Sequence, residues 1–275
     1  MKFAKPREGA ATPVAAPPRA HDVLAGMALL NFRDVAAGND ARPLRAGRLF
    51  RSAQPHHLDQ ADVDRVRDAG IRTIVDLREP HEQVPPDWAP VQALGVAVVR
   101  VPVADQILPS VDEKAPPDGE KTGGSEIDSR SVPEGHRILG GFYRAVVDQA
   151  GSRLAEVMVA VAGGGPVLLH CAAGKDRTGT TVALLLDLIG AAPETIVADY
   201  LRTNEALDDV MRQLTGASMA QVRARTDIPP GIGDAPESAI RALLRHLESK
   251  GGSAAVLLHH TDQATLTRVV AALTE

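Results

Sequence analysis

Cys171 and Arg177 are the residues whose types and spacing most directly indicate chemistry. Cys171 is the only cysteine of the chain, and Arg177 follows it six positions later in the run HCAAGKDRTG over 170–179. A thiolate is a strong nucleophile, but a thiol with a pKa of about 8.5 is mostly protonated at neutral pH. Arg177 offers a planar fork that can hold two phosphate oxygens, which a lysine cannot do. The pair therefore predicts attack of a thiolate on a phosphate monoester.

The residues between this cysteine and this arginine are expected to form a tight anion-binding loop. Small residues and Gly174 allow the backbone N–H groups to point inward. The apolar stretch 166–169 before the loop is typical of a strand, and 178–186 after it is typical of a helix, whose N-terminus attracts an anion. The expected phosphate-binding residues are Ala172, Ala173, Gly174, Lys175, Asp176 and Arg177. Thr178 is expected to donate a hydrogen bond to the sulfur, and His170 to brace the loop and help keep Cys171 ionised.

Two other interpretations of this run fit less well. A buried, inert cysteine beside a surface arginine does not account for the combination of strand, glycine-containing loop, arginine and threonine. A nucleotide-binding Walker loop needs a glycine at Leu169 and a serine or threonine at Asp176.

The run HCAAGKDRTG resembles the active-site loop of the cysteine-dependent protein tyrosine phosphatases, in the bacterial branch typified by mycobacterial protein tyrosine phosphatase B. Four more segments agree in order, namely NFRDV at 31–35, GRLFRSA at 47–53, IRTIVDLR at 71–78 and DYLRTN at 199–204. The resemblance covers about 28–275. It implies a phosphatase that forms a phosphocysteine intermediate without a metal or another cofactor. Phosphotyrosine proteins are the implied substrates and partners, with phosphoserine, phosphothreonine and phosphoinositides as further substrates.

Such a reaction also needs a proton donor for the leaving oxygen. Asp105 is the best candidate, because it follows the expected strand at 96–101 and the carboxyl ends of strands face the ligand crevice of an open α/β sheet. It also matches the family's general acid in the order strand, Pro102, two residues, Asp. Asp112 and Asp128 are the alternatives.

Lys175 and Asp176 make this loop more charged than the commonest tyrosine phosphatase loops. A cation at Lys175 is expected to contact a second phosphate, as in a phosphoinositide. For Asp176 two roles remain open, namely setting the substrate range or forming a salt bridge that makes the loop rigid.

The sequence pattern predicts an α/β fold with a central, mostly parallel sheet flanked by helices and an essentially helical C-terminal third. Strands are expected near 49–51, 73–76 and 96–101, besides the one that precedes Cys171. Helices are expected at about 59–69, 138–149, 152–162, 193–202, 205–214, 238–250 and 264–273.

Composition favours one phosphatase domain over 23–275 after a Pro/Ala-rich, disordered tail at 1–22. A proline-rich and mainly acidic stretch at about 105–135 interrupts the pattern. Both interpretations of it stay open, a solvated insertion or a lid over the cysteine loop.

The remaining composition excludes several classes of function. A net charge of −5 gives no indication of nucleic-acid binding, and no Cys/His cluster has the spacing of a zinc site. No apolar stretch is long enough for a transmembrane segment. The expected location is cytoplasmic, or secreted without a recognisable signal peptide. A phospho-ligand-binding module with weak catalysis and a rhodanese-like sulfur transferase are the rival functions.

Overall fold

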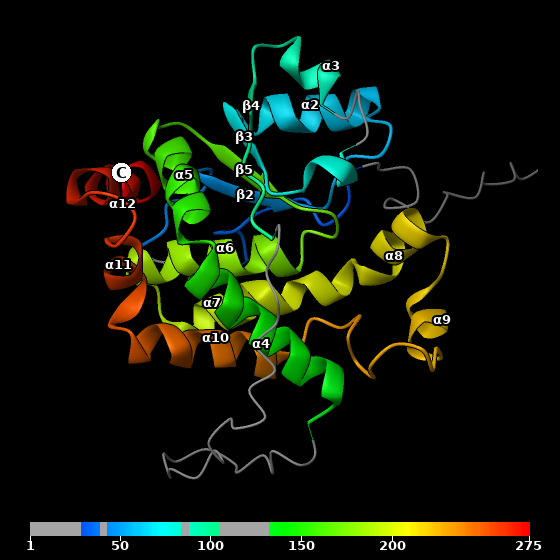
Figure 1. The fold of residues 1–275 in the computed structure, drawn as a ribbon. Coiled ribbons are helices and arrows are strands. Elements are labelled where there is room, and N and C mark those ends of the chain that lie inside the picture. Colours follow the sequence, from blue (N-terminus) through cyan, green and yellow to red (C-terminus); the bar gives the residue numbers. More distant parts are fainter. Residues whose placement is uncertain (1–28, 39–42, 84–87, 105–131) are drawn as a thin grey trace, which may run out of the picture.

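The computed structural model describes residues 29–38, 43–83, 88–104 and 132–275 and has a five-stranded sheet at its centre (Figure 1). The strands are β1 (Arg33–Asp34), β2 (Leu49–Ser52), β3 (Thr73–Asp76), β4 (Ala97–Arg100) and β5 (Val167–His170). Their order across the sheet is β1-β2-β5-β3-β4. β1 runs antiparallel to β2, and all other neighbours are parallel, which confirms the predicted sheet type.

β5 is the central strand, and its carboxyl end lies level with those of β2 and β3. His170 is in register with Ser52 on one side and with Asp76 on the other. Because parallel strands end at the same edge of a sheet, the chain that follows each of them meets at one place. Cys171, the next residue after β5, therefore starts at the middle of this edge.

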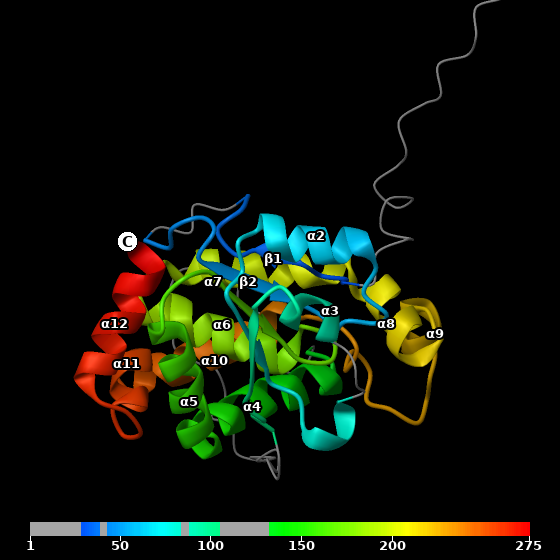
Figure 2. The ribbon, with the colours of Figure 1, turned by 90° about the horizontal axis from the view of Figure 1, so that it is seen from above.

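Side chains of the strands alternate between two apolar cores on opposite faces of the sheet. Ile74 and Leu168 pack on one face with Trp88, below the helices α2 (Gln60–Asp68) and α3 (Ala89–Gln92). Val75 and Leu169 belong to the larger core on the other face. The two views in Figures 1 and 2 show α2 and α3 on one side of the sheet and most other helices on the opposite side.

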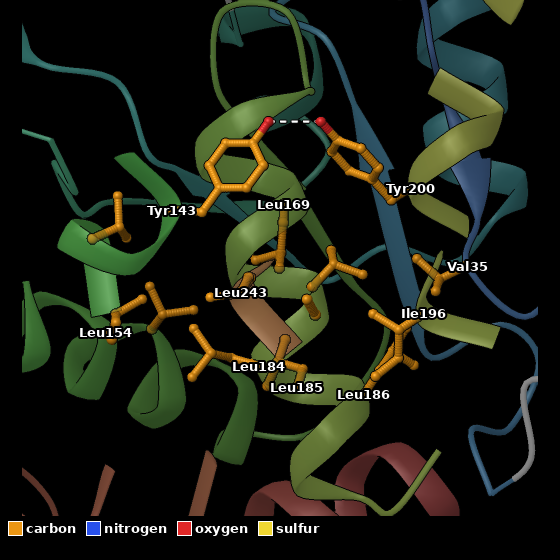
Figure 3. Packing of buried hydrophobic residues seen from close by; sticks show 14 of the residues in the cluster. Val35, Tyr143, Leu154, Leu169, Leu184, Leu185, Leu186, Ile196, Tyr200 and Leu243 are labelled. Atoms are coloured by element: carbon orange, nitrogen blue, oxygen red, sulfur yellow. Dashed lines mark hydrogen bonds between the residues drawn. The ribbon is translucent and has the colours of Figure 1, made fainter. Parts of the chain in front are cut away.

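The helices that build the larger core are α4 (Glu134–Gln149), α5 (Gly151–Ala162), α6 (Asp176–Leu188), α7 (Pro193–Leu201), α10 (Glu237–Ser249), α11 (Gly252–Leu257) and α12 (Gln263–Thr274). Figure 3 shows part of this core, where aliphatic side chains of α6 such as Leu184 and Leu185 pack beside Leu169. The core fixes α6, and hence the first turn of that helix, against the end of β5.

All long helices predicted from the sequence are present, with shifted ends. α4 begins four positions before the predicted start at 138, because Gly135 lets the turn at 230–232 approach its backbone. A Cβ atom there would lie closer than 3.0 Å to backbone atoms of Pro230 and Ile232. The C-terminal third is helical as predicted, and it also contains α8 (Leu207–Thr215).

The short elements were not predicted. They are β1, α3, α9 (Met219–Arg223), α11 and the 3-10 helices η1 (Pro80–Glu82) and η3 (Arg202–Glu205). Such segments carry too little periodicity to be recognised, and their conformation depends on contacts with distant parts of the chain.

The predicted tail at 1–22 and the part of the predicted insertion over 105–131 lie outside the described residues. The single domain over 23–275 accordingly stays a prediction. None of the helices in the described ranges has both the length and the apolar character needed to cross a membrane.

Candidate active site

The loop from Cys171 to Lys175 joins β5 to α6 and turns sharply at Gly174. Cys171 is buried, and Gly174 has a φ of +65°, in the left-handed region that favours glycine. A Cβ atom on Gly174 would lie closer than 3.0 Å to the carbonyl oxygen of Ser52. The glycine is therefore required both by its own conformation and by the approach of the β2 backbone.

The carbonyl groups of this loop are held on its outer side by side chains from far along the chain. Asn31 Nδ2 donates to the carbonyl oxygens of Ala173 and Gly174 at 3.3 and 3.2 Å. Arg51 Nη2 donates to the same Gly174 oxygen at 2.7 Å. Because a trans peptide points its N–H away from its C=O, these bonds turn the N–H groups of Gly174 and Lys175 toward the inside of the loop. The loop thus has the arrangement of an anion-binding nest.

Arg51 is itself held in a buried ionic cluster with Arg33 and Asp199. Asp199 Oδ2 accepts from Arg51 Nη1 at 2.5 Å, and Asp199 Oδ1 accepts from Arg33 Nε at 3.0 Å. Burial alone would raise the pKa of Asp199, but the two guanidinium groups outweigh it and hold the pKa below its ordinary value. Burial, together with repulsion from Arg51, lowers the pKa of Arg33 to about 10. The cluster fixes the loop from the side of β2 and α7.

Arg177 lies in the first turn of α6, and its guanidinium is paired with Glu82 of η1. Nη1 donates to Glu82 Oε2 at 2.5 Å, and Nη2 donates to Oε1 at 2.6 Å. Burial lowers the pKa of Arg177, but the hydrogen bonds to Glu82 and the attraction to the negative charge of a Cys171 thiolate and of Glu82 raise it by more, so that the pKa lies above its ordinary value. Arg177 therefore stays charged and has a fixed orientation beside the loop.

Thr178 in α6 and His170 at the end of β5 are both buried. The hydroxyl of Thr178 is buried and has no hydrogen-bond partner among the described residues, so its predicted bond to the sulfur stays a prediction. His170 is fully buried, and its Nδ1 lies 3.1 Å from the carbonyl oxygen of Cys171. On the other side of the ring, Trp88 Nε1 donates to His170 Nε2 at 2.9 Å.

The Lys175 side chain is buried and reaches the turn before α10. Its Nζ donates to the carbonyl oxygens of Ile232 and Asp234 at 3.0 and 2.8 Å. An ammonium group has three hydrogens, and these two bonds use two of them. The predicted contact of Lys175 with substrate stays a prediction, and the structure gives the amine a second role as an anchor for this turn.

Asp176 accepts a hydrogen bond from Tyr143 at 2.7 Å, and Lys175 lies 3.5 Å from the same oxygen. The Tyr143 hydroxyl also lies 2.7 Å from that of Tyr200, and Figure 3 shows the two hydroxyl groups pointing toward each other. Burial and the nearby Asp176 carboxylate raise the pKa of both tyrosines, so both hydroxyls stay protonated. Of the two roles left open for Asp176, these contacts favour the one that makes the loop rigid.

A pocket of about 320 Å³ borders the loop on the side of Ala173 and Asp176. Its wall is mostly apolar and comes from α8, α9 and the turn that follows, with side chains such as Leu207, Met211 and Ile228. The pocket therefore lies next to the anion-binding loop.

Asp105 lies outside the described residues, but the chain is placed up to the residue before it. The backbone N–H of Ala104 donates to Glu79 Oε1 at 2.9 Å. Glu79 begins the segment that ends with Glu82, the partner of Arg177. The chain is therefore attached beside η1 one residue before Asp105.

Sequence reasoning did not identify Glu82, Trp88 and Tyr143 as residues of this site. Glu82 follows the carboxyl end of β3, and a charged residue at this end of a strand is a candidate for the ligand site by its position alone. Trp88 is the only tryptophan of the chain, and this is the one feature of the sequence that could have drawn attention to it. Nothing in the local pattern marks Tyr143 among the other apolar positions of α4.

In the described ranges, no group of three or more His, Cys, Asp or Glu side chains is arranged so that it could hold a metal ion.

The chain is similar to known tyrosine phosphatases. The model of the tyrosine phosphatase family matches residues 25–275. The triple specificity protein phosphatase PtpB of Mycobacterium tuberculosis is 36% identical over 215 residues, which are 74% of this chain and 76% of that protein. A tyrosine-protein phosphatase of Nostoc commune is 58% identical over 36 residues, 13% of this chain and 12% of that protein.

Among solved structures, P. aeruginosa TpbA is similar with a TM-score of 0.34 and 17% identity, covering 82% of this chain and 95% of that one. The family match spans the loop, its arginine and the segments that hold them, and the M. tuberculosis relative matches most of the chain. The protein therefore belongs to the tyrosine phosphatase family and is a cysteine-dependent phosphatase.

Proposed function

We propose that Cys171 is the nucleophile and that Arg177 and the loop N–H groups bind the phosphate of the substrate. The thiolate attacks phosphorus, a sulfur–phosphorus bond forms, and the bond from phosphorus to the leaving oxygen breaks. Asp105 gives its proton to that oxygen. Arg177 and the loop N–H groups stabilise the charge on the three other oxygens during this step.

In the second step a water molecule replaces the sulfur. The Asp105 carboxylate takes a proton from the water, the oxygen of the water bonds to phosphorus, and the sulfur–phosphorus bond breaks. Inorganic phosphate and the thiolate are the products. Thr178 donates a hydrogen bond to the departing sulfur, which would give its buried hydroxyl a partner.

The observation that carries this proposal is the position of Cys171 at the base of a loop whose carbonyl groups are bonded to Asn31 and Arg51. A loop bonded in this way presents several N–H donors to one anion, which suits a phosphate and also stabilises a thiolate.

The proposed substrates are phosphotyrosine proteins, with phosphoserine, phosphothreonine and phosphoinositides as further substrates. The M. tuberculosis relative supports this range, because it is named as a triple specificity protein phosphatase. The apolar pocket beside the loop also suits the organic group of a phosphate ester.

The role of Cys171 is tested with an aryl phosphate in the presence of excess chelator. We expect the wild-type enzyme to be active and Cys171→Ser to lose turnover while it still binds the substrate. Turnover that survives the substitution would refute Cys171 as the nucleophile, and dependence on added metal would refute the mechanism.

The role of Asp105 is tested with two substrates that differ in their leaving group. Asp105→Asn is expected to lower kcat/KM, which reports on the first step, by about 10² or more for a phenyl phosphate, whose leaving oxygen needs a proton, and much less for a p-nitrophenyl phosphate. Asp112→Asn and Asp128→Asn are the matched controls. If one of these shows the leaving-group dependence instead, that residue is the acid.

The substrate range is tested with a phosphotyrosine peptide, a phosphothreonine peptide and a soluble phosphoinositide, using wild type and Lys175→Met. A selective loss of phosphoinositide activity in the variant supports contact between Lys175 and a second phosphate. An equal loss for all three substrates supports the anchor role of Lys175 and refutes that contact.

A further inference from the structure

The buried ring of His170 has a different kind of partner at each nitrogen. Nδ1 lies 3.1 Å from the carbonyl oxygen of Cys171, which can only accept a hydrogen bond. Nε2 lies 2.9 Å from Nε1 of Trp88, which can only donate one. A hydrogen is therefore required on Nδ1, and a free electron pair is required on Nε2. Both conditions hold together only in the neutral ring with its proton on Nδ1.

Asp76 is the group that would favour a different state of this ring. Its Oδ1 lies 3.4 Å from His170 Nε2, a position from which a carboxylate attracts a second proton onto the ring. The Asp76 carboxylate, however, already accepts hydrogen bonds from Arg78. The backbone N–H and Nε of Arg78 bind Oδ1 at 3.1 and 2.9 Å, and Nη2 binds Oδ2 at 2.8 Å. The charged group next to the ring is thus Asp76 at the end of β3, which is itself paired with Arg78, and Cys171 follows His170 in the chain.

The position of Trp88 is well defined by packing. Its side chain is 3% exposed and lies in the apolar core between the sheet and α3. The indole and imidazole rings meet edge to face, with centroids 5.1 Å apart and an angle of 64° between their planes. The indole N–H is thereby aimed at one nitrogen and cannot turn away without breaking this packing.

We propose that Trp88 is a positioning residue for the nucleophile, which holds His170 in the neutral state with its proton on Nδ1 bonded to the Cys171 carbonyl. His170 then fixes the first peptide of the loop without placing a positive charge beside the sulfur. The thiolate is stabilised by the loop N–H groups, the N-terminus of α6 and Arg177. This inference rests on Cys171 as the reacting residue, but its test does not depend on turnover.

The test replaces only the N–H group of the Trp88 indole. Because the chain has one tryptophan, biosynthetic incorporation of benzothienylalanine changes Trp88 alone and exchanges its N–H for a sulfur. Incorporation of 4-fluorotryptophan is the matched control, since it keeps the N–H. Trp88→Phe is a second variant without the donor, in case the analogue does not fold.

Two measurements are made on each protein. The first is the pH dependence of alkylation by iodoacetate, which reports on Cys171 alone because it is the only cysteine. The second is the ¹⁵N NMR spectrum of the histidine rings. For wild type and the fluorinated control we expect a neutral ring with an unprotonated Nε2 and one ionisation in the alkylation profile.

In the benzothienylalanine protein and in Trp88→Phe we expect Nε2 to take up a proton opposite Asp76. The new positive charge should lower the midpoint of the alkylation profile by about one pH unit. A protonated Nε2 in the wild-type protein at neutral pH would overturn the proposal. So would alkylation profiles that coincide in the presence and absence of the indole N–H.

Discussion

Glu82 and Arg177 form a two-pronged ion pair although they are 95 residues apart, with both carboxylate oxygens bonded to the terminal nitrogens of the guanidinium. Nη1 also lies 3.4 Å from the carbonyl oxygen of Leu77. None of the described residues bonds to Nε of Arg177, and in the proposed mechanism the phosphate binds at this edge of the guanidinium. Glu82 is held in turn by the backbone N–H of Glu79, at 2.8 Å from Oε2.

Glu82→Gln should lower kcat/KM about tenfold, because the variant loses the charge of a hydrogen-bonded ion pair that orients Arg177. Steady-state kinetics with an aryl phosphate measure this. Glu194→Gln is the control, since Glu194 forms a similar two-pronged pair with Arg241 on the surface and should not affect activity. An increase of kcat/KM in Glu82→Gln would show instead that Glu82 competes with the phosphate.

Gly174→Ala should abolish turnover, because a methyl group there collides with the β2 backbone at Ser52 and the left-handed conformation is unfavourable for alanine. Gly190→Ala is a matched control with a φ of +78° and no atom within 4 Å of the added Cβ. It should cost about 1–2 kcal/mol of unfolding free energy and leave kcat/KM unchanged. Urea unfolding and kinetics on both variants separate the collision from the backbone conformation. If the two variants were equally active, the close approach of the β2 backbone at Ser52 would not require a glycine at position 174.

Tyr143→Phe should impair activity more than Tyr200→Phe. Tyr143 donates its hydrogen to Asp176, so Tyr200 must donate to Tyr143. Removing the Tyr143 hydroxyl takes away the donor to Asp176 and leaves the buried Tyr200 hydroxyl without this partner, at a cost of about 1–3 kcal/mol. Tyr200→Phe leaves the bond to Asp176 in place. The ratio of kcat/KM between the two variants measures the effect, and a larger loss in Tyr200→Phe would refute this order of donors.

Asp199→Asn should destabilise the protein by about 3–5 kcal/mol at neutral pH, because it leaves the buried Arg33 and Arg51 without their counter-charge. The pKa of Asp199 in the folded protein lies below its ordinary value of 3.8. The stability that its ionised form contributes is therefore fully present above about pH 4 and is lost as the pH falls through the folded-state pKa.

The difference in unfolding free energy between wild type and Asp199→Asn should accordingly shrink on acidification below about pH 4. Urea unfolding at neutral and acidic pH checks this. Asp227→Asn, which removes an exposed partner of Arg225, should leave the unfolding midpoint at neutral pH unchanged. If the difference in unfolding free energy between wild type and Asp199→Asn grew toward low pH, the pKa of Asp199 in the folded protein would not be lowered.

The sequence by itself determined the parts of this protein that are encoded locally. Cys171, Gly174 and Arg177 are separated by a few residues, and their spacing between an apolar strand and a helix already predicts an anion-binding loop. The long helices and the parallel strands were also predicted correctly, because a strong periodic pattern defines each of them.

Only the tertiary structure decided what surrounds this loop. Asn31 and Arg51 hold its carbonyl groups, Glu82 holds Arg177, and Trp88 reaches His170, from elements that lie far from the loop in sequence. A side chain of this kind is specified by the register of neighbouring strands and the packing of helices, and not by any local pattern.

The same holds for the direction of a long side chain. The contact of Lys175 with a substrate phosphate stays a prediction, and the structure adds that its amine bonds to the carbonyls of Ile232 and Asp234. The partners of the amine lie more than fifty residues further along the chain. The physical reason is that a buried ammonium group must have its hydrogen bonds satisfied, and the fold alone brings the acceptors to it.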